Sequence, residues 1–329
     1  MLYKPTIIGT GSYLPDKVLT NADLEKMVDT SDEWIRTRTG IVERRLAEDN
    51  VASSDLGVIA ANRALENAKL EATAVELIIV ATITSDMPFP ATACYIQERI
   101  GAKKAAALDI NAACSGYIYG LEIARQFIAT GTYMTVLVVA AEVMSRIVDW
   151  KDRSTCVLFG DGAGAAVLKR ASSKDGRKFL GAYLGTDGSA ADLLKIPAGG
   201  SRLPASHETV EQGLHYLKMS GNEVFKFAVK AMEEVVSELL RREGLKAKDI
   251  ALLIPHQANL RIIDAVARRL GLSRKKVYIN VDRYGNMSSA SVAVGLDEVN
   301  RQGNLHPGDL AIMATFGSGF TWAACLIEW

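Results

Sequence analysis

The sequence lacks three features that would direct it to nucleic acid, to a membrane or out of the cell. Its 38 Lys and Arg balance its 38 Asp and Glu, so no net charge favours nucleic acid or an anionic membrane. No apolar run reaches the roughly 18 residues of a transmembrane helix. The first 15 residues also lack the basic start and apolar core of a signal peptide. We expect a cytoplasmic protein with neither nucleic acid nor membrane as a partner.

Cysteine is scarce, and its spacing excludes two of its usual roles. The chain has four cysteines, at positions 94, 114, 156 and 325. They form no C-x-x-C pair, and no histidine follows at zinc-finger spacing. We therefore expect neither a metal site nor a disulfide framework, as in a reducing compartment.

The chain does contain buried strands that alternate with helices. Its 329 residues are 49% hydrophobic, which is enough for two domains or one large duplicated one. Short runs rich in Val, Ile and Leu predict strands buried on both faces, and amphipathic patterns before two of them predict helices. The strands lie at 76–82, 135–143, 251–256 and 310–319, and the helices at 55–69 and 221–244. This alternation predicts an α/β fold.

The sequence also contains a weak internal repeat. One offset of 175 residues superimposes three pairs of segments, at Leu70 and Leu245, Gly120 and Gly295, and Thr135 and Leu310. We infer two related halves, 1–172 and 173–329, joined by a linker near 170–180. The site is expected between them. The unpatterned stretch 187–213 predicts a long surface excursion, which at that length is more often functional than idle.

The stretch "DINAACSGYIYG" places Cys114 among small residues where a strand becomes a helix. The positive end of a helix dipole lowers a thiol pKa, so the position predicts a thiolate near neutral pH that accepts an acyl group as a thioester. The same offset superimposes Asn111 on Asn286. His256 ends one predicted strand, and "FGSGF" ends another. Because ligands bind beyond the carboxyl ends of strands, these stretches are expected to converge.

The residue types at this junction suit carbonyl chemistry. His256 and Asn286 both donate hydrogen bonds, and two donors on one carbonyl oxygen stabilise an enolate. Backbone N–H groups of Cys114 and the glycine-rich "FGSGF" would form a second oxyanion site. A packed cysteine, a core histidine and a turn asparagine would explain each residue alone. These structural alternatives do not explain why all the stretches lie at the ends of matched strands.

Together, "NAACSGYIYGL", "PHQANLRI", "GNMSSAS" and "FGSGFTW" resemble the motifs of the β-ketoacyl-acyl-carrier-protein synthase III enzymes, of thiolase-like fold. "TSDEWIRTRTGI" and "FGDGAGAAVL" match too, so the resemblance runs from Gly9 to the end of the chain. It implies a duplicated five-layered αβαβα fold and a homodimer. It also implies that an acyl-CoA primer and malonyl-acyl-carrier protein condense with loss of CO₂, through an acyl-cysteine, to start fatty acid synthesis. The coenzyme A thioester would be a substrate, and no resident cofactor is implied.

The same resemblance implies roles at matching positions only. Cys114 would carry the acyl group, His256 and Asn286 would bind the malonyl thioester carbonyl, and the backbone of Cys114 and Ser318 would form the oxyanion site. The other positions are Trp34, Arg38, Arg153, Asn259 and Phe225 for CoA, Arg261, Lys226 and Arg268 for the carrier protein, and Phe89 for the partner's acyl pocket. Ser318 stands where the family commonly has glycine, so its backbone donor depends on dihedral angles that a side chain tolerates.

Two of these roles have independent physical support and an ordinary alternative. Trp34 and Arg38 are spaced i, i+4, so a helix over "SDEWIRTR" would place an indole beside a guanidinium, as a nucleotide with phosphates requires. The alternative is a surface tryptophan packed under its own arginine. Six cations crowd a short stretch and would steer an acidic partner, or form a solvated helix face: Arg261, Arg268, Arg269, Arg274, Lys275 and Lys276. "GDGAGAAVL" lacks the dinucleotide fingerprint and predicts a tight turn between strands at "STCVLF" and "GAAVLKR".

Three rival functions remain open from the sequence. A cysteine hydrolase would use His256 as a base against the thiol and would hydrolyse esters without malonyl-carrier protein. A non-catalytic acyl-binding scaffold would tolerate Cys114→Ser. A condensing enzyme of secondary metabolism would differ only in its substrates. The length and branching of the primer depend on side-chain packing, which the sequence does not give.

Overall fold

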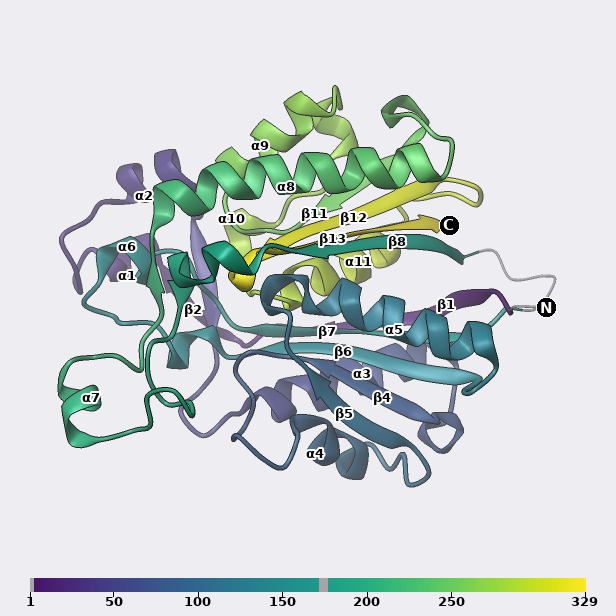
Figure 1. Ribbon diagram of the computed structural model, residues 1–329, viewed down its shortest axis with the longest axis horizontal. Coiled ribbons are helices and arrows are strands. Elements are labelled where there is room, and N and C mark those ends of the chain that lie inside the picture. Colours follow the sequence, from purple (N-terminus) through teal and green to yellow (C-terminus); the bar gives the residue numbers. More distant parts are fainter. Residues whose placement is uncertain (1–2, 172–176) are drawn as a thin grey trace.

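The computed structural model describes residues 3–171 and 177–329, and its centre is one mixed sheet (Figure 1). In these residues the strand order is β11-β12-β13-β8-β1-β7-β6-β4-β5. The strands are β1 (Pro5–Tyr13), β4 (Leu77–Ala81), β5 (Ala106–Ile110), β6 (Thr135–Glu142), β7 (Gly162–Arg170), β8 (Lys178–Thr186), β11 (Leu252–Pro255), β12 (Leu310–Gly317) and β13 (Thr321–Glu328). Every residue of β4 and β6 is buried, as the apolar runs predict.

The strand order repeats, and the repeat confirms the duplicated α/β fold. From β4 through β6 and β7 to β1, the pairings are parallel, antiparallel and antiparallel. From β11 through β12 and β13 to β8 they follow the same sequence. The two series meet where β1 pairs with β8 at a single position, Thr6 with Lys178. The predicted boundary between residues 172 and 173 lies outside the described residues and stays a prediction.

Helices divide the molecule into five layers, visible from top to bottom in Figure 1. One outer layer holds α8 (Gly221–Arg242) and α9 (Leu260–Arg269), and the other holds α3 (Ser53–Ala68) and α4 (Thr92–Arg99). Between the two parts of the sheet lie α5 (Gly116–Thr130) and α11 (Ala290–Gln302). This is the αβαβα arrangement that the resemblance implies. No described helix is long and apolar enough to cross a membrane.

The remaining elements are short and gather at one end of the layers, on the left of Figure 1. Two small sheets pair β2 with β3 and β9 with β10. Their bounds and those of the short helices are β2 (Lys17–Thr20), β3 (Glu43–Leu46), β9 (Leu194–Lys195), β10 (Lys218–Met219), α1 (Asn21–Leu24), α2 (Asp32–Thr39), α6 (Arg153–Cys156), α7 (His207–Glu211) and α10 (Val281–Tyr284). The excursion 187–213 thus contains β9 and α7.

One sequence-based assignment is wrong. "STCVLF" is not a strand, because its first three residues belong to α6, which Asp152 caps by accepting a hydrogen bond from Ser154 N–H at 2.9 Å. A local cap of this kind outweighs the strand preference of the following Val and Leu. The strand expected at "GAAVLKR" is present as part of β7.

The two central helices begin with the same strained turn. Ala113, just before Cys114, has φ 47°, and Ser288, just before Ser289, has φ 48°. Both are non-glycine residues in the left-handed region, and they correspond under the offset of 175 residues. The turn redirects the chain between β5 and α5 in one half and between α10 and α11 in the other, so each half presents a turn residue at the junction.

Candidate active site

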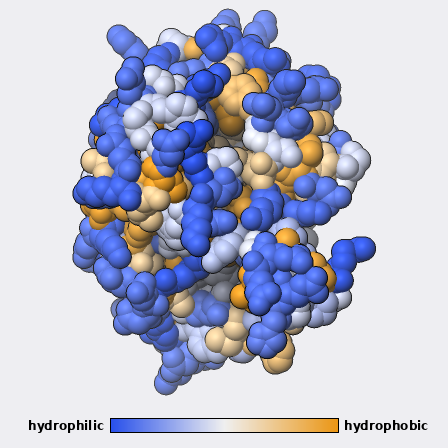
Figure 2. Space-filling model, turned by 90° about the vertical axis from the view of Figure 1, so that its left-hand side faces the viewer, coloured by the Kyte–Doolittle hydropathy of each residue, from blue (hydrophilic) through white to orange (hydrophobic). Residues whose placement is uncertain are grey.

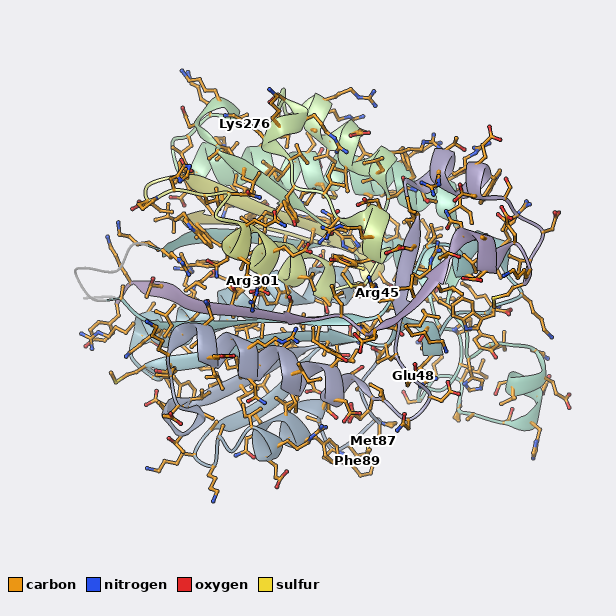
Figure 3. The ribbon with its side chains drawn as sticks, turned by 180° about the vertical axis from the view of Figure 1, so that it is seen from behind. Arg45, Glu48, Met87, Phe89, Lys276 and Arg301 are labelled. Atoms are coloured by element: carbon orange, nitrogen blue, oxygen red, sulfur yellow. The ribbon has the colours of Figure 1, made fainter. Side chains whose placement is uncertain are left out.

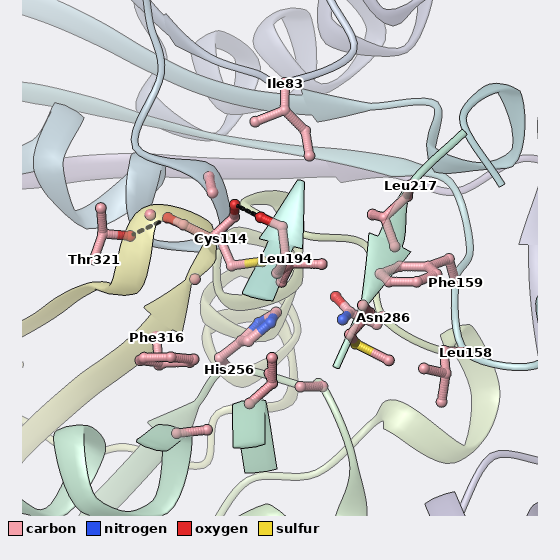
Figure 4. A pocket seen from close by; sticks show the side chains of 18 of the residues that line it. Ile83, Cys114, Leu158, Phe159, Leu194, Leu217, His256, Asn286, Phe316 and Thr321 are labelled. Carbon is pink, nitrogen blue, oxygen red and sulfur yellow. Dashed lines mark hydrogen bonds between the residues drawn. The ribbon is translucent and has the colours of Figure 1, made fainter. Parts of the chain in front are cut away.

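A cavity of about 510 Å³ lies at the ends of the matched strands, and both halves of the chain line it (Figure 4). Cys114, His256 and Asn286 reach it from three separate stretches, together with Gly317 and Ser318 of the glycine-rich segment. The structure therefore brings together the residues that the sequence selects. The excursion also contributes to the wall, through Leu194, Lys195 and Ile196.

The environment of Cys114 contradicts one expectation. Its side chain is buried, at 8% exposure, in the 3₁₀ turn Ala113–Ser115 that leads into α5. The pKa of the thiol is raised to about 12, chiefly by burial; the Ser288 hydroxyl acts against this rise and the Glu142 carboxylate adds to it. The expectation of a thiolate near neutral pH is therefore wrong, because desolvation outweighs the helix dipole.

Glu142 and Ser288 are functional neighbours that sequence reasoning missed. Glu142 ends β6, is fully buried and accepts hydrogen bonds from Ser289 Oγ at 2.7 Å and Ile83 N–H at 3.1 Å. Burial raises the pKa of this carboxyl. The Ser288 hydroxyl makes no hydrogen bond of ordinary geometry, yet it is near enough to Cys114 and Glu142 to lower the pKa of both. A charged residue at the end of an otherwise apolar strand was the available signal.

His256 and Asn286 are both arranged as neutral donors. His256 is 3% exposed, and burial lowers its pKa to about 4, so the imidazole is neutral at pH 7 and carries one N–H. The Asn286 Oδ1 accepts a hydrogen bond from Ser288 N–H at 2.9 Å. With this oxygen engaged, the amide nitrogen is the group that Asn286 offers to a ligand. Figure 4 shows both side chains below and beside Cys114, facing the cavity.

The glycine-rich segment packs directly on the nucleophile turn. A Cβ on Gly317 would lie 2.6 Å from the backbone nitrogen of Cys114, so only glycine fits there. Thr321 Oγ1 donates a hydrogen bond to the Ala112 carbonyl at 2.9 Å. Gly319 has φ 70°, whereas Ser318 is not among the described non-glycine residues with positive φ. The dihedral condition on Ser318 is therefore met without strain.

Four of the residues assigned to CoA by resemblance contact one another in two pairs, and two of the five reach the cavity. The Arg153 guanidinium lies over the Trp34 indole, 5.0 Å from the ring centroid, and α2 is helical as predicted. Arg153, not Arg38, is therefore the cation on the indole. Asn259 caps α9 and donates a hydrogen bond from Nδ2 to the Arg38 carbonyl at 3.1 Å. Asn259 and Phe225 both line the cavity.

The cations proposed for the carrier protein are exposed, but they do not form one patch. Arg261 begins α9 at the mouth, 5.6 Å from the Phe225 ring centroid, and Lys226 is exposed on α8. Arg268 lies two turns further along α9. Figure 3 places Lys276 at the far end of the molecule. The six cations therefore do not form a single patch. Two of them are in ion pairs, Arg269 with Glu233 and Arg274 with Asp264.

The exposed surface near the cavity is largely hydrophilic, with apolar patches between the charged side chains (Figure 2). Phe89 stands apart, since it is 85% exposed and lies at the edge of the molecule beside Met87 (Figure 3). It is not among the residues that line the cavity of its own chain. The geometry thus leaves Phe89 available to a second molecule.

Comparison with known proteins agrees with this architecture. Family models described as 3-oxoacyl-[acyl-carrier-protein (ACP)] synthase III match residues 108–188 and, for its C-terminal part, residues 240–329. A β-ketoacyl-[acyl-carrier-protein] synthase III of Caldanaerobacter subterraneus subsp. tengcongensis is 59% identical over 98% of this chain and 97% of its own length.

Solved structures agree over the whole fold. The 3-oxoacyl-[acyl-carrier-protein] synthase III of Aquifex aeolicus is 47% identical, with a TM-score of 0.91, over 99% of this chain and 100% of that one. The priming β-ketosynthase of the R1128 polyketide pathway is 36% identical, with a TM-score of 0.91, over 99% and 96%. This chain belongs to the β-ketoacyl-[acyl-carrier-protein] synthase III family.

Proposed function

We propose that this acyltransferase condenses an acyl-CoA primer, expected to be acetyl-CoA, with malonyl-acyl-carrier protein and so starts fatty acid synthesis through an acyl group on Cys114. The observation that carries the proposal is a single cavity in which a thiol, two neutral donors and the backbone of a glycine-rich segment meet. The names of the Caldanaerobacter and Aquifex relatives, both [acyl-carrier-protein] synthases III, support the same reaction.

Acylation begins with the buried thiol. Cys114 Sγ forms a bond to the carbonyl carbon of the primer thioester, the thiol proton leaves, and the bond to the CoA sulfur breaks so that CoA departs as its thiol. Because burial holds the thiol pKa at about 12, only a small fraction is ionised at neutral pH. The backbone N–H groups of Cys114 and Ser318 would receive the oxyanion of the tetrahedral intermediate, which lowers this barrier.

Condensation uses the two neutral donors. Loss of CO₂ from the malonyl thioester leaves an electron pair on its α-carbon, shared with the thioester oxygen as an enolate. His256 N–H and the Asn286 amide would donate to that oxygen. The α-carbon then attacks the acyl thioester, and the Cys114 sulfur leaves and regains a proton. Burial supports this role, because a His256 pKa of about 4 keeps the ring neutral without preventing donation.

The substrates would be held at the mouth, and the reaction would need no resident cofactor. Trp34 and Arg153 would flank the adenine, Arg38 would meet phosphates, and Asn259 and Phe225 would contact the pantetheine arm. Arg261, Lys226 and Arg268 would contact the acidic carrier protein, and their exposure supports this. Phe89 of each chain would complete the acyl pocket of a partner in a homodimer, which its 85% exposure supports.

The second candidate is a priming synthase of secondary metabolism. The similarity to the R1128 priming β-ketosynthase favours it specifically. The two candidates share the chemistry at Cys114 and differ in the acyl group and the carrier protein. Primer profiling therefore separates them.

The test is intact-protein mass spectrometry after incubation with a panel of acyl-CoAs, followed by addition of malonyl-carrier protein. Wild type should gain the mass of one acyl group, and Cys114→Ala should gain none. His256→Ala and Asn286→Ala should still acylate but release little condensed product. An acyl adduct on Cys114→Ala, or equal loss of both half-reactions in the other two variants, would overturn the proposal.

A further inference from the structure

Residues 318–321 contact two different parts of the cavity at once. On one side, Ser115 Oγ donates a hydrogen bond to the Thr321 carbonyl at 3.2 Å, and Thr321 Oγ1 donates to Ala112, so this segment holds the nucleophile turn. On the other side, Asp187 N–H donates to the Phe320 carbonyl at 3.0 Å, at the start of the excursion. The segment therefore joins the oxyanion backbone to the excursion.

The Ser318 side chain adds a second link to the excursion. Its hydroxyl donates a hydrogen bond to the Leu194 carbonyl, drawn as a dashed line in Figure 4. Leu194 pairs with Met219 in the β9–β10 sheet, and both residues line the cavity. Figure 4 shows the Leu194 and Cys114 side chains, which both line the cavity. A glycine at position 318 would have no hydroxyl to make this link.

Backbone hydrogen bonds also attach the wall formed by β9 and β10, from Leu217 N–H to the Ile147 carbonyl and from Ser220 N–H to the Leu193 carbonyl, both at 2.8 Å. β9 and β10 have only two residues each, and a two-stranded sheet of that length is not stable alone. The wall residues Leu194, Ile196 and Leu217 line the same cavity as Cys114. The position of this wall therefore limits the space available to an acyl chain on Cys114.

We infer that the Ser318 hydroxyl makes Ser318 a specificity-determining residue, which holds the β9–β10 wall against the oxyanion segment and so favours short acyl primers. The inference rests on the proposed function, and it concerns the side chain of Ser318 rather than its backbone N–H. Without the hydrogen bond from Ser318 to Leu194, the wall can move away from Cys114. The expected change in primer preference corresponds to the free energy of one net hydrogen bond.

The test measures kcat and KM for condensation with acetyl-CoA, butyryl-CoA and hexanoyl-CoA in four proteins: wild type, Ser318→Ala, Ser318→Gly and Ser318→Thr. The ratio of kcat/KM for hexanoyl-CoA to that for acetyl-CoA should rise about 5- to 10-fold in the Ala and Gly variants. It should stay within about twofold of wild type in Ser318→Thr, which keeps the hydroxyl. The KM for malonyl-carrier protein should not change.

A matched control lies on the same excursion. Ser189 Oγ donates a hydrogen bond to Asp187 within its own turn, so Ser189→Ala removes a hydroxyl without touching the oxyanion segment. Its primer ratio should equal that of wild type. As an independent readout, trypsin should cleave after the exposed Arg202 faster in Ser318→Ala and Ser318→Gly than in Ser318→Thr.

Two results would overturn the inference. One is an unchanged primer ratio in both Ser318→Ala and Ser318→Gly, and the other is a Ser318→Thr ratio that rises as much as theirs. Failure of the proposed function would look different, because wild type would then gain no acyl group on Cys114 and give no condensed product with any primer.

Discussion

Cys114 lies where two electrostatic effects oppose each other. The start of α5 favours negative charge near the thiol, whereas removal from water disfavours it. The second effect is larger, because burial raises the pKa of the Cys114 thiol to about 12. Such a cysteine reacts slowly with oxidants and alkylating reagents at neutral pH, since the thiolate is the reactive form.

This thiol state predicts a pH dependence. An acid with a raised pKa stays protonated as pH rises, so the rate of iodoacetamide alkylation at Cys114 should increase about tenfold per pH unit from pH 6 to 9.5, without a plateau. Peptide mass spectrometry measures this rate, with the exposed Cys94 as an internal control in the same sample. A plateau of the Cys114 rate below pH 8 would show that the helix dipole dominates.

At the residue scale, the sequence predicted which side chains meet but not their ionisation. Cys114, His256 and Asn286 each end or follow a matched segment, so their convergence follows from topology. Their pKa values depend on burial by residues distant in the chain, such as Glu142 beside Cys114. The order of residues along one strand does not predict the contact between Glu142 and Cys114.

At the element scale, the two strained turns and the glycine-rich segment share one role. Ala113 and Ser288 hold left-handed backbone where α5 and α11 are about to begin, at a cost of about 1–3 kcal/mol each. Gly317 closes against the first of these turns. The catalytic backbone is thus fixed by close packing between elements, not by hydrogen bonds within one element.

Gly317→Ala should therefore impair catalysis. The added Cβ would lie 2.6 Å from the Cys114 backbone nitrogen and 3.1 Å from its Cβ, so the turn must shift and the oxyanion donor with it. We expect kcat for condensation to fall by about 10²–10³, the range for loss of one oxyanion donor. Gly188→Ala is the control, since a Cβ there has no neighbour within 4 Å. Wild-type kcat in Gly317→Ala would contradict this prediction.

The elements themselves were largely predictable, and the exceptions have a physical reason. The periodicity identified β4, β6, β11 and β12 because their residues are buried on both faces. The strand assigned to "STCVLF" was wrong because a side-chain cap set the local structure as a short helix. The excursion had no periodicity, and it became a cavity wall through contacts with Ser318 and Phe320, which lie far along the chain.

At the scale of the whole molecule, Phe89 is the most exposed of the large apolar side chains in the described residues. Phe89 is 85% exposed, and Met87 beside it is 39% exposed. Burial of such a side chain by a second copy is favourable by about 1.5–3 kcal/mol. The resemblance assigned Phe89 to a partner's pocket, and this assignment stays a prediction.

Phe89→Asp should weaken the homodimer, because the substitution places a charge where an apolar ring is expected to be buried. Light scattering should give wild type twice the 35.5 kDa of one chain, and the variant should dissociate at micromolar concentration. Met27→Asp, at a side chain that is 49% exposed, is the control and should stay dimeric. A monomeric wild type, or an unaffected Phe89→Asp dimer, would refute the assignment.

The two halves of the sheet are joined through a single paired position between β1 and β8. Under the proposed roles, the nucleophile Cys114 belongs to one half and both enolate donors belong to the other, so we expect neither half alone to turn over. Two separately expressed halves should regain activity only by complementation. An ancestor of one half's length would then have needed two copies to carry out the same chemistry.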